Sequence, residues 1–66
     1  MNHSYADLLK KYRKEKKLSQ YELAKQLGKT QQAIANYENG KNKVDSTVLL
    51  LLSHDIDWLR IIYNIS

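Results

Sequence analysis

The segment TQQAIANYENGK places amide side chains where a helix would expose them. If Ile34 and Tyr37 mark the inward side, a rotation of about 100° per residue turns Gln32 and Asn36 away from the core. Gln31 then lies at the flank of the same helix. An amide both donates and accepts hydrogen bonds, which is the chemistry that matches the N6 and N7 atoms of adenine. Idle surface amides would give the same pattern, so this segment alone leaves recognition and simple solvation open.

Spacing around this segment favours recognition. Five residues fall at positions 1, 5, 9, 15 and 18 of a twenty-residue window: Gln20, Ala24, Gly28, Ile34 and Tyr37. The fifth position must be small where two helices cross, the ninth must accept a sharp turn, and the last two must pack on the core. The pattern predicts a helix-turn-helix over residues 19–39, which lays its second helix in the major groove of DNA. Ala35 keeps that helix slim and could touch a thymine methyl group.

Helical spacing and capping residues predict an all-α fold, a compact five-helix bundle around one core. The candidate N-caps are Ser4, Ser19, Thr30, Asp45 or Ser46, and Asp55 or Asp57. Ser19 and Glu22 form a capping box. We expect the first helix over residues 5–16, the second to end at Gly28, and the third to close at residues 39–40.

The chain has 66 residues and is interpreted as one domain, residues 1–66. It has no cysteine and no proline, which excludes disulfides and thiolate metal sites and favours uninterrupted helices. Its longest apolar run, VLLLL, falls far short of the roughly 20 residues of a membrane span. We recognise no signal peptide, so we expect a soluble, cytoplasmic protein with no membrane partner.

Charge is unevenly distributed along the chain. Residues 1–43 hold ten of the eleven Lys and Arg residues against four acidic ones, a net charge of +6, whereas residues 44–66 carry −2. A basic front indicates a polyanionic partner on one side of the molecule. A solvated lysine surface would give the same count, so charge alone leaves both interpretations open.

The sequence does not indicate catalysis. His54, Asp55 and Asp57 resemble a metal site in composition, but they lack a second histidine nearby, and N-capping explains the two aspartates better. Ser53, His54 and Asp55 are adjacent on one short turn, which cannot form the geometry of a catalytic triad. We therefore expect no enzyme activity, no metal and no cofactor.

The phrases LSQYELAKQLGKTQQAIANYENGK and DWL resemble the phage repressor/Cro group of helix-turn-helix proteins, the XRE family. The resemblance implies a five-helix DNA-binding domain that acts as a symmetric dimer. It places the base-reading positions at Gln31, Gln32 and Asn36, with Ala35 beside them. It places phosphate contacts at Ser19, Gln20, Asn39, Lys41 and Lys43, and the charge of Lys29 makes that residue a further candidate. It also pairs Arg13 with Glu38 in a buried ion pair, for which a guanidinium is well suited, and a surface arginine that touches phosphate directly is the alternative.

These expectations predict a sequence-specific repressor that binds a palindromic operator on double-stranded DNA as a homodimer, in the cytoplasm of a bacterium at its nucleoid. The dimerisation region is expected at residues 55–66, through Ile61, Ile62, Tyr63 and Ile65. No small-molecule effector is expected. An antitoxin that binds a toxin partner is the main alternative. A membrane-surface helix from YADLLKKYRKEKK is a weaker alternative, because it leaves the helix-turn-helix spacing unexplained.

Overall fold

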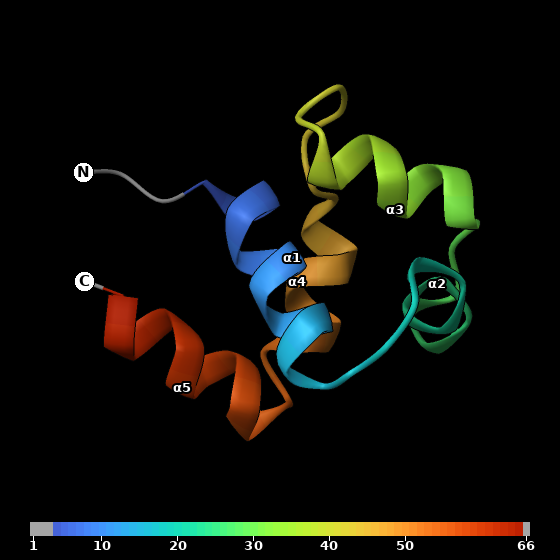
Figure 1. Cartoon of the computed structure of the whole chain (residues 1–66). Helices are drawn as coiled ribbons and strands as arrows, with labels where there is room; N and C mark the ends of the chain where they lie inside the picture. Colours follow the sequence, from blue (N-terminus) through green and yellow to red (C-terminus); the bar gives the residue numbers. More distant parts are fainter. Residues whose placement is uncertain (1–3, 66) are drawn as a thin grey trace.

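The computed structural model describes residues 4–65, apart from the side chain of Ile65. This part of the chain forms five helices and no strand, as the all-α prediction requires. The helices are α1 (Tyr5–Glu15), α2 (Gln20–Leu27), α3 (Gln31–Glu38), α4 (Ser46–Leu52) and α5 (Ile56–Ile65). Figure 1 shows α1 and α4 crossing near the centre, with α2 and α3 on one side of them and α5 on the other.

Each helix begins where a side-chain oxygen accepts a hydrogen bond from a backbone amide that the helix itself leaves unpaired. The capping oxygens belong to Ser4, Ser19, Thr30, Asp45 and Asp55, at 2.8–3.2 Å from the amides that they accept. At α2 the capping box is complete, because the Glu22 carboxylate also accepts from the Ser19 amide at 2.8 Å. The predicted caps are therefore confirmed.

Three residues adopt the left-handed backbone conformation at the ends of α1, α2 and α3. Two are the chain's only glycines, Gly28 (φ 69°) and Gly40 (φ 78°), which fill the predicted turns at no steric cost. The third is Lys17 (φ 58°), which directly follows the C-cap Lys16 of α1. The sequence did not indicate this position, because a lysine carries no signal for a left-handed turn.

The core is built from apolar residues of all five helices. Its largest members include Tyr12 of α1 and Trp58 of α5, whose rings meet edge to face with centroids 5.9 Å apart. Ile61 belongs to this core and is 1% exposed. Its side chain is therefore covered within the protomer, and the expected dimer contact through this residue stays a prediction.

Candidate nucleic-acid interface

The orientation of α3 is the one that its sequence predicts. Ile34 and Tyr37 are buried in the core, which leaves Gln32 exposed and Asn36 half-buried on the outer side. The Gln32 side-chain nitrogen donates a hydrogen bond to the Asn36 Oδ1 atom at 3.1 Å, one helical turn away. The two amides are thus held next to each other. They retain donors and acceptors for a partner, because each amide group offers more hydrogen bonds than this single contact uses.

The packing of α3 against α2 keeps this surface outward. Ala24 of α2 is 2% exposed, and its small side chain lets the two helices approach closely. Gly28 then reverses the chain in the left-handed conformation, and Thr30 caps α3 two residues later. Gln31, in the first turn of α3, is exposed beside a shallow hollow lined by Tyr21 and other residues of α2. Ala35 is half-buried.

An ion pair joins α1 to the last turn of α3. Arg13 donates from Nε and Nη2 to the two carboxylate oxygens of Glu38, at 2.7 Å and 3.1 Å. A third donor of Arg13 reaches the carbonyl oxygen of Leu18 at 3.0 Å, and the Gln20 amide donates to Glu38 at 3.2 Å. The side chains of Arg13 and Glu38 are 15% and 5% exposed, and the hydrogen bonds to Glu38 raise the pKa of Arg13. The structure therefore contains the expected ion pair, and the Gln20 amide adds a further hydrogen bond to its carboxylate.

The residues that are expected to contact phosphate lie at both ends of α3 and at the start of α2. Ser19 is exposed beside the half-buried Gln20. Asn39 accepts a hydrogen bond from the backbone amide of Lys41 at 2.9 Å, which shapes the turn after α3. Lys41 and Lys43 are exposed on the loop that follows. These groups lie at the start of α2 and in the turn and loop that follow α3.

Lys29 lies in a different environment from the loop lysines. Its ammonium group pairs with the Asp45 carboxylate at 3.1 Å, and the hydrogen bond between them raises the pKa of Lys29. The pKa of Asp45 is lowered, first by the hydrogen bond from the Thr47 amide and then by that from Lys29. Lys29 thus stabilises the loop before α4, and its charge is shared with a carboxylate.

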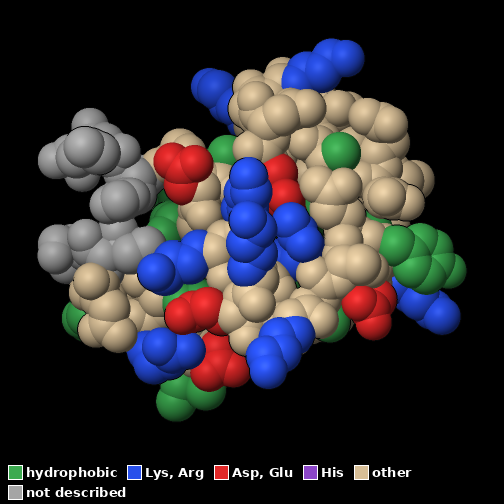
Figure 2. Space-filling model, viewed as in Figure 1, with side chains coloured by type: hydrophobic (Ala, Val, Ile, Leu, Met, Phe, Trp, Pro, Cys, Tyr) green, Lys and Arg blue, Asp and Glu red, His purple; other side chains and the backbone are tan. Residues whose placement is uncertain are grey.

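Basic side chains gather over α1, beside α3. Figure 2 shows them clustered near the middle of the face that Figure 1 presents. Lys10 and Lys14 of α1 contribute to the rim of a surface hollow that also includes Ala35 of α3. The basic surface is therefore continuous with the outer side of α3.

The expected dimer residues on α5 lie in three different environments. Ile61 is buried, Ile62 is half-buried against the core, and Tyr63 is 82% exposed. The side chain of Ile65 lies outside the described part of the chain. Ile56 and Leu59 are also exposed, and with Tyr63 they follow helical spacing along one side of α5. Sequence reasoning missed the first two, because apolar residues occur almost all around this helix.

A polar contact between α1 and α5 was also missed. The Tyr12 hydroxyl donates to the Asp55 carboxylate at 2.6 Å, and Lys16 pairs with Asp57 at 2.9 Å. Burial, followed by this hydrogen bond, raises the pKa of Tyr12 to about 12. The hydrogen bond from Tyr12 lowers the pKa of Asp55. No local signal connects residues 43 positions apart, so only the fold reveals this contact.

None of the helices described between residues 4 and 65 is long and apolar enough to cross a membrane. Within the same range, no cluster of three or more His, Asp or Glu residues could hold a metal ion. His54 is exposed, and Asp55 serves as the cap of α5.

Comparison with known protein families identifies a match over most of the chain. The family described as Helix-turn-helix matches residues 9–57, about three quarters of the chain. The match spans α2, α3 and the turn between them, together with most of α1, all of α4 and the start of α5. No curated protein and no solved structure matches the sequence significantly.

Proposed function

The chain belongs to the helix-turn-helix family of DNA-binding transcription regulators, and from this premise we propose that it is a sequence-specific repressor. It binds a palindromic operator on double-stranded DNA as a homodimer, with α3 of each protomer in the major groove. The observation that supports this most directly is the outward pair Gln32 and Asn36, linked at 3.1 Å on a helix whose other side is buried. A solvated helix more often exposes Lys and Glu.

In this proposal the base edges are read by the exposed side of α3, through Gln31, Gln32 and Asn36 with Ala35 beside them. Amides suit adenine, and the alanine methyl group suits thymine. Contacts to the sugar-phosphate backbone set the register of the helix in the groove. They come from Ser19, Gln20, Asn39, Lys41 and Lys43. We leave Lys29 out of this set, because its charge is shared with Asp45.

The homodimer and the palindromic operator are proposed together, because a two-fold symmetric site is matched by a two-fold symmetric protein. Two recognition helices related by a two-fold axis would contact half-sites about 34 Å apart, one turn of the duplex. The exposed apolar side of α5, formed by Ile56, Leu59 and Tyr63, is the contact that we propose between the protomers. Binding would then depend on protein concentration through dimerisation, and the bound dimer would exclude polymerase from the promoter.

The decisive experiment is the selection of bound duplexes from a random pool. A palindromic consensus with half-sites one turn apart is the expected result, because only a symmetric dimer imposes that symmetry. If the dimer contacts six phosphates in total, the logarithm of the binding constant should fall with the logarithm of salt concentration with a slope near −5. A consensus without symmetry would contradict the dimer, and the absence of any preference would contradict base reading.

Variants of the selected complex separate the two kinds of contact. Gln32→Ala should cost about 1–3 kcal/mol on the selected duplex and relax one base position, because it removes contacts to one base. Lys43→Ala should weaken binding to all sequences alike, because phosphates carry no sequence information. Equal losses on selected and unrelated duplexes for Gln32→Ala would refute its assignment to a base.

A further inference from the structure

A polar hollow of about 340 Å³ lies between α1 and the C-terminal half of α3. Its rim includes Lys10 and Lys14 from α1, Gln20 from the start of α2, and Asn39 at the end of α3. The Arg13–Glu38 pair also lines it. Because Ala35 borders the same hollow, the opening is continuous with the proposed base-reading side of α3.

The charge of this hollow is positive and comes from two lysines. The Glu38 carboxylate is occupied by both donors of the Arg13 fork and by the Gln20 amide, so its negative charge is balanced within the protein. Three cations and one carboxylate line the hollow, which gives it a net charge of +2. Among the described residues, no ion pair engages Lys10 or Lys14, whereas Lys16, Lys29 and Arg60 all face carboxylates.

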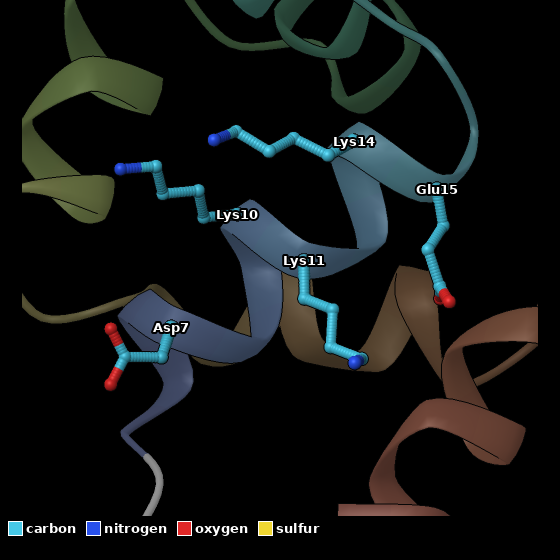
Figure 3. Close-up of a pocket in the computed structure, with 5 residues that line it drawn as sticks. All are labelled: Asp7, Lys10, Lys11, Lys14 and Glu15. Carbon is cyan, nitrogen blue, oxygen red and sulfur yellow. The ribbon is translucent and has the colours of Figure 1, made fainter.

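The arrangement of the two lysines is unfavourable for the protein alone. Lys10 and Lys14 are four residues apart on α1, and Figure 3 shows their side chains leaving the helix on the same side. Like charges at this spacing repel each other. Lys11 leaves another side of the helix in Figure 3, and it lies four residues from both Asp7 and Glu15. Lys11 thus has acidic neighbours at helical spacing on both sides, whereas Lys10 has one, Asp7, three residues away, and Lys14 has none. An anion between Lys10 and Lys14 would relieve the repulsion between them.

We propose that Lys10 and Lys14 bind a backbone phosphate of the DNA duplex that α3 reads, which makes α1 a third element of the interface. The Gln20 amide supports this contact, because it has a second N–H beyond the one donated to Glu38. The inference rests on the proposed function, since it assigns a phosphate of the same duplex. It explains why the positive charge of α1 is concentrated beside α3.

The test compares the double variant Lys10→Gln/Lys14→Gln with Lys11→Gln, all in the full chain. Dissociation constants are measured for the selected duplex and for an unrelated duplex over a range of salt concentrations. If each protomer loses one phosphate contact, the double variant should reduce the steepness of the salt dependence by about 2 for the dimer. Both duplexes should lose affinity by the same factor, and Lys11→Gln should retain the wild-type slope.

Thermal unfolding without DNA distinguishes this result from damage to the fold. The double variant should melt at or slightly above the wild-type temperature, because the substitution removes a repulsion. An unchanged salt slope in the double variant, or an equal change in Lys11→Gln, would overturn the inference. Failure of the proposed function has a different signature: the wild-type protein itself would show no preference among duplexes, and Gln32→Ala would change nothing.

Discussion

Replacement of Arg13 by alanine should destabilise the fold more than any loss of surface charge could. The substitution leaves the Glu38 carboxylate, which is 5% exposed, with the Gln20 amide as its remaining side-chain partner. An isolated charge in such a place is strongly unfavourable, because the protein interior solvates it poorly. The breaking of a buried ion pair typically costs about 3–5 kcal/mol.

That cost is large compared with the stability of so short a chain. At about 0.05–0.15 kcal/mol per residue, a domain of 66 residues has a free energy of unfolding of roughly 3–10 kcal/mol. Each kcal/mol lowers the melting temperature of a domain this size by about 4–8 °C. Arg13→Ala should therefore lower it by at least about 12 °C, and should leave a large fraction of the protein unfolded at 37 °C if the starting stability is low.

Circular dichroism during heating and urea titration measures this directly, without DNA. Lys11→Ala is the matched control, because it removes an exposed cation from the same helix and should change stability by no more than about 0.5 kcal/mol. The double variant Arg13→Met/Glu38→Leu should regain most of the loss, since an apolar pair of similar volume can replace a buried ion pair. A wild-type melting temperature in Arg13→Ala would refute the reasoning. Equal instability in the single and double variants would instead assign the loss to hydrogen bonds that the apolar pair does not replace, such as that from Arg13 to the Leu18 carbonyl oxygen.

Two further predictions concern the C-terminal end of α1. Lys17→Gly should raise the free energy of unfolding by about 0.5–1 kcal/mol in urea titrations, because glycine adopts φ 58° without strain. The control Lys14→Gly, within the helix, should lower the free energy of unfolding by about 1 kcal/mol. If Lys17→Gly were the less stable of the two variants, the strain at Lys17 would be contradicted. Tyr12→Phe should cost about 1.5–3 kcal/mol, because it removes a hydrogen bond to the charged Asp55, and unfolding measured against pH should show the linkage. The pKa of Asp55 in the folded protein lies below its ordinary value of 3.8, so the ionised carboxylate stabilises the fold above about pH 4. This stabilisation is lost as the pH falls through the pKa of the folded state. Tyr12→Phe should therefore lose less stability than the wild type when the pH is lowered. An acid profile identical to that of wild type would contradict this linkage.

The parts of the fold that follow from local chemistry could be predicted from the sequence. Ser19, Glu22 and Gly28 lie within ten residues of one another, and their hydrogen bonds and backbone angles depend on little else. The outward direction of Gln32 and Asn36 follows from helical rotation once Ile34 and Tyr37 are assigned to the core.

The parts that depend on how distant elements meet could not be predicted. Tyr12 and Asp55 contact each other because α5 packs on α1, and nothing in either segment specifies that packing. The inward side of α5 was equally hidden. Isoleucine, leucine, tryptophan and tyrosine occur around most of this helix, so periodicity did not distinguish the buried Ile61 from the exposed Leu59.

The Arg13–Glu38 pair connects stability with the proposed interface. A carboxylate in the last turn of a helix lies near the negative end of the helix dipole, where it is unfavourable. Glu38 occupies this place and borders a hollow that we assign to phosphate, where its charge would repel the ligand. Arg13 balances that charge by direct contact, with its Nε atom 2.7 Å from the Glu38 carboxylate. The double variant Arg13→Met/Glu38→Leu should therefore regain most of the stability that Arg13→Ala loses, and the hollow keeps its net charge of +2 from Lys10 and Lys14. The ion pair thus adds nothing to the net charge of the proposed phosphate site.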